Sequence, residues 1–189
     1  MKNKAIALVL LSTLLTSCIA VVVAGAAGGM VVYDRRSVVV MESDARIFYK
    51  ARTTIVSDPC FRDARIVVTS FNEVVLLTGQ TPSGALRQLA ESMARKVPNV
   101  KRVYNEITVQ APITFAQRSQ DTWITSQIRA QMLTQKGLES GSIRVVTENS
   151  IVYLMGIVSR EQAELAVSVA RQVSGVTKVV KVFQYISIK

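Results

Sequence analysis

The chain has 189 residues, of which 49% are hydrophobic and 19% charged, so a wholly disordered protein is excluded and there is room for one domain or two small ones. It contains no histidine, which excludes imidazole catalysis, histidine-ligated metals and histidine-based nucleophilic triads. No group of Asp and Glu residues has the spacing of a metal site. We therefore expect no enzyme activity, no metal and no cofactor.

The N-terminus has the order of a secretory signal: two lysines, an uncharged run over residues 5–15, and small residues before Cys18. This segment resembles a bacterial lipoprotein signal, in which residues 15–18 would be the lipobox. The resemblance implies that residues 1–17 are removed and that Cys18 is acylated. Because Ile19 rather than an aspartate follows, it also implies an outer-membrane protein that is anchored at Cys18 and faces the periplasm.

An uncleaved membrane span is the alternative, since residues 5–33 carry no charge and about 20 apolar residues cross a bilayer. The Gly- and Ala-rich segment 20–30 favours a flexible linker, and we assign residues 18–43 to the acylated cysteine and this linker. Cleavage would remove Lys2 and Lys4 and no acid, which lowers the formal net charge from +10 to +8. Export excludes nucleic acid as a partner and leaves an anionic membrane surface or an acidic protein.

The second cysteine of the chain is Cys60. Acylation of Cys18 would leave it without a partner in its own chain, so no internal disulfide is expected. We predict that Cys60 is a small buried side chain. A reactive thiol, or one that forms an intermolecular bond, is the alternative.

The rest of the chain contains an internal duplication, which appears when the sequence is aligned with itself at an offset of 77 residues. After a gap of one residue, the identities continue into the second half of each copy. The matched pairs are Asp44/Asp121, Ile47/Ile124, Arg52/Arg129, Val68/Val145, Asn72/Asn149, Val75/Val152, Leu77/Leu154, Gly79/Gly156, Ala94/Ala170, Val97/Val173, Val100/Val176 and Val103/Val179. The sequence therefore predicts two similar domains, at 44–112 and 113–189.

In the first copy we predict the order helix, strand, strand, helix, strand. Its second helix is expected to have Thr81 as the N-cap and Pro82 as the first helical residue, and segment 100–109 is expected to form the last strand. The positions of this helix that we expect to face the core are Leu86, Leu89, Ala90, Met93 and Val97.

The second copy predicts the same order. Asp121 is expected to cap its first helix, and two β-rich segments around a polar turn predict a pair of strands. Ser159 opens a capping box for the second helix, and the alternating segment 176–186 predicts the last strand. The positions expected to be buried are Ile124, Ile128 and Met132 in the first helix, and Ala163, Ala166, Val167, Ala170 and Val173 in the second.

Each copy is thus predicted to be an α+β domain in which two helices cover one face of a three-stranded mixed sheet. This order of elements resembles that of BON domains. The resemblance extends to the strands that run to Gly79 and Gly156 and to the helix ends "KVPNVKRV" and "QVSGVTKV". Two of them in tandem behind a lipobox resemble dual BON-domain outer-membrane lipoproteins. The resemblance implies binding of anionic phospholipid through the first helix of the second domain, support of outer-membrane integrity and enrichment at division sites.

The first helix of the second copy also has a suitable surface by its geometry. With about 100° of rotation per residue, Trp123 lies opposite the buried Met132. An aromatic side chain bordered by cations is typical of a helix that lies in a membrane–water interface. Packing of Trp123 against the other domain is the alternative. Because the first copy has no tryptophan at the matching position, we expect lipid contact in the second copy alone, at Trp123, Ser126, Gln127, Arg129, Ala130, Leu133 and Lys136.

Gly79 and Gly156 are predicted to be structural, because a side chain there would collide with the neighbouring helix or need an unfavourable φ. The alternative to lipid binding is an envelope scaffold whose paired domains bind a protein, such as the outer-membrane assembly machinery. Lipid binding and scaffolding would differ in their dependence on lipid charge and on Trp123.

Overall fold

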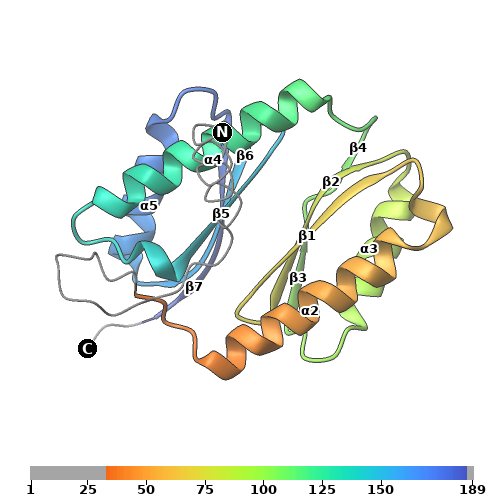
Figure 1. The fold of residues 1–189 in the computed structure, drawn as a ribbon, viewed down its shortest axis with the longest axis horizontal. Coiled ribbons are helices and arrows are strands. Elements are labelled where there is room, and N and C mark those ends of the chain that lie inside the picture. Colours follow the sequence, from red (N-terminus) through yellow and green to blue (C-terminus); the bar gives the residue numbers. More distant parts are fainter. Residues whose placement is uncertain (1–32, 187–189) are drawn as a thin grey trace, which may run out of the picture. The chain divides into compact units, whose positions relative to one another are not determined.

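The computed structural model describes residues 33–186, and these residues belong to one compact unit (Figure 1). The predicted signal, Cys18 and the linker before residue 33 lie outside the described residues. Within the described part of the chain, no helix is both long enough and apolar enough to cross a membrane.

The first repeat has the predicted order of elements. They are α2 (Val38–Val56), the 3-10 turn η1 (Pro59–Phe61), β1 (Arg65–Phe71), β2 (Val74–Thr81), α3 (Gly84–Arg95), β3 (Arg102–Asn105) and β4 (Thr108–Val109). The sheet is mixed, because β2 pairs antiparallel with β1 and parallel with β3 and β4. Both helices cover the same face of this sheet, and their apolar sides form one core with it (Figure 1).

The second repeat has the same architecture. Its elements are α4 (Phe115–Thr134), the 3-10 turn η2 (Ser140–Ser142), β5 (Ile143–Glu148), β6 (Ile151–Val158), α5 (Arg160–Gln172) and β7 (Lys178–Tyr185). Here β6 pairs antiparallel with β5 and parallel with β7, and α4 and α5 cover one face (Figure 1). The predicted fold class, two tandem α+β domains with mixed sheets, is therefore confirmed.

The first helix of each repeat begins several residues before the aspartate that the duplication pairs, which is Asp44 in the first repeat and Asp121 in the second. The N-cap of α2 is Ser37, whose hydroxyl accepts a hydrogen bond from the N–H of Val40, and the N-cap of α4 is Thr114. The prediction that Asp121 caps a helix is wrong. Asp121 and its counterpart Asp44 lie inside their helices and are buried. Helix α2 consequently takes up residues 38–43, which were assigned to the linker.

Each buried aspartate binds the turn between the first two strands of its repeat. The carboxylate of Asp121 accepts hydrogen bonds from the N–H groups of Asn149, at 2.7 Å, and Ser150, at 2.9 Å. The carboxylate of Asp44 does the same for the turn between β1 and β2. Both residues of each turn have positive φ, between 51° and 63°. The aspartates therefore stabilise two-residue turns whose positive φ angles are costly for residues other than glycine.

Two details of the first repeat also differ from the prediction. Helix α3 has Ser83 as its N-cap, because Thr81 is the last residue of β2, and Leu89 is exposed rather than buried. The expected last strand is split into β3 and β4. The side-chain carbonyl of Asn105 accepts a hydrogen bond from the N–H of Ile107 at 3.3 Å, which interrupts the ladder at this point.

The two sheets pack against each other through their faces away from the helices. Along β2, Val75 and Leu77 belong to the core under the helices, whereas Leu76 points to the opposite face. Strand β2 is consequently buried along its whole length, and β6 along most of its length. The apolar cluster between the sheets draws on both repeats, and its buried members are Phe71, Val74, Leu76, Tyr153, Met155 and Val182.

Polar contacts join the repeats at the edge of this cluster. The buried carboxylate of Glu148 accepts hydrogen bonds from Arg65, at 2.5 Å, and from the side-chain amide of Gln80, at 2.7 Å. Burial, followed by the charges of Glu106 and Glu148, raises the pKa of Tyr153 to about 12. The interface therefore holds one ion pair with its hydrogen bonds made and a phenol that stays neutral at physiological pH.

Candidate functional site

Helix α4 has one buried and one exposed side. Ile124, Ile128 and Met132 recur every four residues and are buried in the core of the second repeat, as expected. Trp123 lies on the opposite side of the helix, where it is 52% exposed. The alternative in which Trp123 packs against the other domain does not occur in this structure.

The predicted lipid-contact residues that lie within α4 share its exposed side. Leu133 is 41% exposed, Ser126 and Ala130 are exposed, and Gln127 is partly buried. We call Trp123, Ser126, Ala130 and Leu133, together with the residue Phe115 described next, the α4 face. Lys136 is exposed but follows the end of α4 at Thr134, so the helical position expected for it does not apply.

Phe115 extends the α4 face and escaped the sequence analysis. It is the first residue of the helix, it is 75% exposed, and it precedes Leu133 by about five helical turns, which places both on the same side. The guanidinium of Arg118 lies 5.5 Å from the centre of its ring. The helical periodicity, continued back to Thr114, could have found Phe115, but the expected N-cap at Asp121 made the predicted helix begin too late.

The charges that α4 itself places beside the α4 face are positive. Arg118 and Arg129, about three turns apart, lie on α4, and Asp121 is the only acidic residue of the helix. Since Asp121 is buried and engaged with the turn, its carboxylate does not reach the exposed side. Arg129 donates one hydrogen bond to the backbone carbonyl of Val145 at 3.1 Å. The α4 face therefore combines an indole, a phenyl and a leucine side chain with cations.

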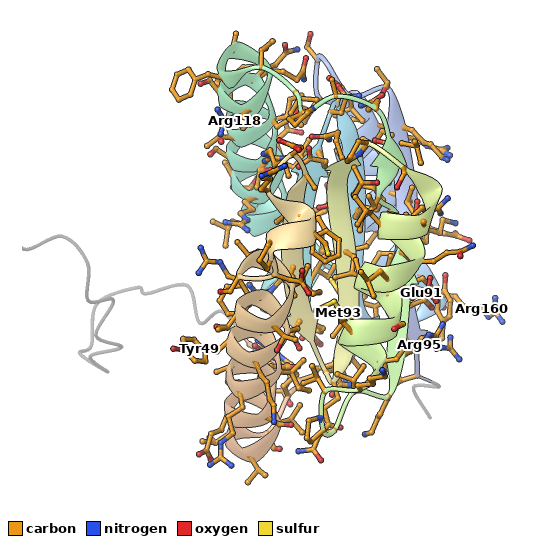
Figure 2. All side chains as sticks on the ribbon, turned by 90° about the vertical axis from the view of Figure 1, so that its right-hand side faces the viewer. Tyr49, Glu91, Met93, Arg95, Arg118 and Arg160 are labelled. Atoms are coloured by element: carbon orange, nitrogen blue, oxygen red, sulfur yellow. The ribbon has the colours of Figure 1, made fainter. Side chains whose placement is uncertain are left out.

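Helix α2 of the first repeat offers a different surface. Tyr49 is 71% exposed and Val56 is 50% exposed, so apolar groups are also present here. However, Arg46, which aligns with Trp123, forms an ion pair with Glu42 at 2.5 Å. Figure 2 shows α2 and α4 along the same side of the ribbon, with Tyr49 projecting from α2. Helix α2 thus lacks the indole and carries an acid that its counterpart lacks.

The two predicted structural glycines lie inside their strands and not at the strand ends. Gly79 has a φ of +114°, and a Cβ there would lie 1.9 Å from the backbone oxygen of Arg65 in the paired strand β1. A Cβ on Gly156 would lie 2.7 Å from the backbone oxygen of Ser142. In both cases the obstructing group is backbone of the same sheet or the turn before it, and not a neighbouring helix.

The prediction that Cys60 is buried is wrong. Cys60 is exposed and free, because the 3-10 turn η1 directs Phe61 into the core and Cys60 outward. The hydrogen bond and the negative charge of Asp58 raise the pKa of the Cys60 thiol. Since the thiolate is the nucleophile, this thiol is accessible but not activated at neutral pH.

Replacing Asp58 with asparagine is expected to increase the rate of Cys60 alkylation. Loss of the negative charge lowers the pKa of the thiol and so raises the thiolate fraction at pH 7. The rate with iodoacetamide, measured by mass spectrometry on residues 32–189, checks this, and the difference should vanish at a pH above both thiol pKa values. Asp63→Asn is the control, and equal rates for all three proteins would contradict the assignment.

The described residues 33–186 contain no group of three or more His, Cys, Asp or Glu side chains that could hold a metal ion. The titratable groups whose pKa is displaced are spread over the fold. One example is Glu73, where the ion pair with Lys101 at 2.6 Å lowers the pKa. Asp34, Arg36 and Arg144 form one group of displaced pKa values, and the others lie apart from it. The exposed α4 face, with its indole, remains the best candidate site.

Comparison with known proteins places both repeats in one family. The profile of the BON domain matches residues 43–111 and 120–187. The outer membrane lipoprotein DolP of Haemophilus influenzae is 35% identical over 97% of this chain and 96% of its own length. A 21 kDa hemolysin of Actinobacillus pleuropneumoniae is 40% identical over 66% of this chain and 64% of its own. The C-terminal domain of CdsD from Chlamydia trachomatis aligns with a TM-score of 0.31 at 12% identity, a similarity too low to bear on the fold.

Proposed function

We propose, from the premise that this chain belongs to the BON-domain family, that it is an outer-membrane lipoprotein that binds anionic phospholipid through helix α4 of its second BON domain. The proposal includes a lipid anchor at Cys18 that leaves both domains in the periplasm, and a role in outer-membrane integrity at division sites. The similarity to DolP along almost the whole chain supports the localisation.

The observation that carries the lipid-binding proposal is the composition of the α4 face. Trp123 and Leu133 are both about half exposed on a helix whose single acid is buried. Indole rings favour the membrane–water interface, and arginine side chains can lay their stems on apolar surface while the guanidinium reaches a phosphate. Arg118 and Arg129 lie where they can do so.

The expected affinity of this face is modest. Trp123 and Leu133 together would bury on the order of 200 Å², which corresponds to about 5 kcal/mol before ordering costs are subtracted. An acyl anchor at Cys18 would keep the face close to the bilayer and so raise its effective concentration. A weak contact is therefore sufficient for a protein that is already tethered.

A protein scaffold is the second candidate function, and the exposed side of α2 is the observation that favours it. Phe48, Tyr49 and Val56 are exposed there without a partner element in the described residues. Such a surface fits a periplasmic protein partner, for which the outer-membrane assembly machinery is one candidate. Proteins of this family are non-enzymatic envelope proteins, and we propose no catalytic role.

Replacing Trp123 with glutamate is expected to weaken vesicle binding by roughly 100-fold, because the exposed half of the indole contributes about 3 kcal/mol when it is buried in lipid. Residues 32–189 would be sedimented with vesicles of phosphatidylglycerol or of phosphatidylcholine. Trp123 is the single tryptophan of the chain, so a blue shift of the intrinsic fluorescence reports its transfer into lipid directly.

Tyr49→Glu is the matched control, because it places the same charge on the exposed side of the equivalent helix. Its binding should stay within about twofold of the unchanged protein. Binding that depends on neither lipid charge nor Trp123 would favour the scaffold, and a larger loss in Tyr49→Glu than in Trp123→Glu would place the contact on α2.

A further inference from the structure

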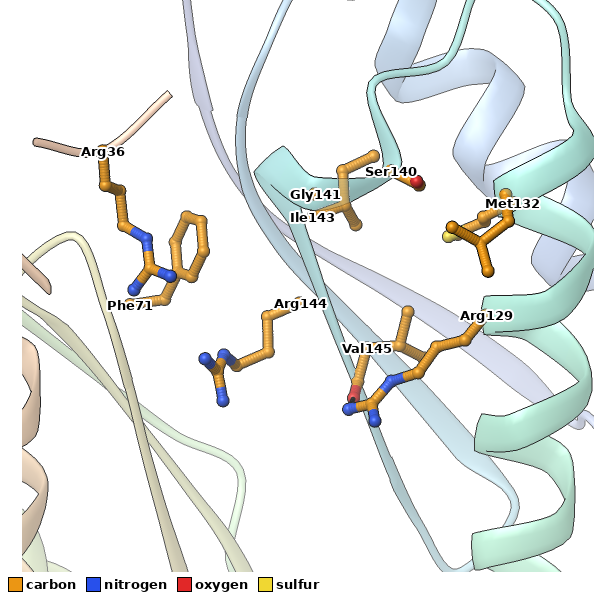
Figure 3. A pocket seen from close by; sticks show the side chains of 10 residues that line it. Arg36, Phe71, Arg129, Met132, Ser140, Gly141, Ile143, Arg144 and Val145 are labelled. Atoms are coloured by element: carbon orange, nitrogen blue, oxygen red, sulfur yellow. Dashed lines mark hydrogen bonds between the residues drawn. The ribbon is translucent and has the colours of Figure 1, made fainter. Parts of the chain in front are cut away.

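A cavity of about 350 Å³ lies where the two repeats meet, between the segment before α2 and the C-terminal part of α4. Arg36 and Phe71 line one side, Arg129 and Met132 line the other, and the side chain of Arg144 extends from β5 between them (Figure 3). A second cavity, of about 370 Å³, adjoins the first and shares Arg36 and Arg144 with it. Arg144 is thus the side chain on which both cavities converge.

The first cavity has apolar walls and opens toward the α4 face. Phe71, Met132 and Ile143 are buried and contribute the walls. Leu133 also lines the cavity, and it is 41% exposed on the α4 face. Because one side chain belongs to both surfaces, the cavity and the α4 face are continuous.

The positive charges around the cavity are only partly balanced. Arg36 is engaged, since its guanidinium forms ion pairs with Asp34 at 2.7 Å and Asp44 at 2.8 Å and lies 4.1 Å from the centre of the Phe71 ring. Arg129 donates one hydrogen bond to a backbone carbonyl. Three arginines therefore face two carboxylates, which leaves one positive charge in excess.

Arg144 is the arginine that holds this excess. Among residues 33–186 its side chain has neither an ion pair nor a hydrogen bond, although the side chains of Arg36 and Arg129 each have partners. Partial burial, followed by the positive charges of Arg36 and Arg129, lowers its pKa. A guanidinium presents several N–H donors in a planar fork that matches a phosphate group.

We propose that this cavity binds the phosphodiester headgroup of an anionic phospholipid, with Arg144 as the principal charge partner and Arg129 as the second. The inference rests on the proposed function, because the opening beside Leu133 gives a lipid at the α4 face access to the cavity. The single negative charge of a phosphodiester balances the excess positive charge, and Phe71, Met132 and Ile143 contact the adjoining glycerol and acyl carbons. Trp123 would then supply partition into the bilayer, and Arg144 the preference for anionic lipid.

The first test uses residues 32–189, a compact unit with its own apolar cores, and dihexanoyl phosphatidylglycerol below its micelle concentration. In a nuclear magnetic resonance titration we expect the amide signals of Gly141 and Arg144 to shift. Arg144→Gln should weaken this binding at least tenfold. The affinity of Arg144→Lys should lie between those of Arg144→Gln and the unchanged protein. Arg171→Gln, which removes an exposed arginine from α5, should stay within twofold.

The second test separates this inference from the function on which it rests. Arg144→Gln should lower the preference for phosphatidylglycerol over phosphatidylcholine vesicles about tenfold, while the fluorescence shift of Trp123 persists at high lipid. Trp123→Glu should lose vesicle binding but keep the soluble lipid. If Arg144→Gln matches Arg171→Gln in both assays, the headgroup site is overturned whatever Trp123→Glu does. Signals that shift only outside the cavity, or displacement of the soluble lipid by an equal concentration of inorganic phosphate, also overturn it.

Discussion

Replacing Gly79 with valine is expected to destabilise the first BON domain by about 4 kcal/mol, a large part of the stability typical of a small domain. Two independent costs add at this position. The φ of +114° is strained for any residue with a Cβ, and that Cβ would lie 1.9 Å from the backbone oxygen of Arg65. Because the obstructing atom is backbone in the paired strand, relief requires β1 and β2 to separate.

Thermal and chemical unfolding of residues 32–189, followed by circular dichroism, would measure this loss. The expected decrease in Tm is about 8 to 16 °C. Gly84→Ala is the matched control: Gly84 is the first residue of α3 and a Cβ there meets no atom within 4 Å, so we expect no loss or a slight gain. Gly156→Val should be less severe than Gly79→Val, because its φ is not positive. A Gly79→Val protein as stable as Gly84→Ala would contradict the structural role.

Replacing Asp121 with alanine is expected to cost about 3 to 5 kcal/mol in the second domain. The substitution leaves the N–H groups of Asn149 and Ser150 without their charged acceptor, at a turn where both residues have positive φ. It also frees the side-chain amide of Gln117, which donates to the same carboxylate at 3.0 Å. Asp121→Asn keeps the shape and loses the charge, so about half of the effect is expected.

The same unfolding measurements check this prediction, with Glu164→Ala on the exposed side of α5 as the control for the loss of one acid. We expect the control to change the stability by less than about 0.5 kcal/mol. Ser150→Gly removes the cost of one positive φ, so it should recover part of the stability lost in Asp121→Ala. If Ser150→Gly recovers nothing and Asp121→Ala behaves like the control, the carboxylate does not stabilise the turn.

The fold followed from the sequence because the signals that specify it are local and occur twice. The helical spacing of Ile124, Ile128 and Met132 and the alternation along β7 are properties of neighbouring residues, and the duplication showed both in two copies. The caps were less predictable. Asp121 has the composition of an N-cap, but its carboxylate is used by a turn 28 residues away, and such a contact leaves no local pattern.

The candidate site was predictable to the extent that it lies on one helix. The exposed position of Trp123 follows from the helical period, whereas the cavity at Arg144 depends on how the segment before α2, β1 and β5 come together. A local pattern carries no information on that arrangement. One signal did bear on it: the first half of β2, "VVLL", is a run of four apolar residues rather than an alternation, as is typical of a strand covered on both faces, and this points to a second layer over the sheet.

The apolar cluster between the sheets has a consequence for the origin and behaviour of the chain. Phe71 and Leu76 from one repeat meet Tyr153 and Met155 from the other, so either repeat alone would expose a hydrophobic surface to water. The two repeats resemble the subunits of an obligate dimer, because each covers an apolar surface of the other, but here both belong to one polypeptide chain. Dilution therefore does not dissociate them, and a single copy produced by itself is expected to self-associate or precipitate.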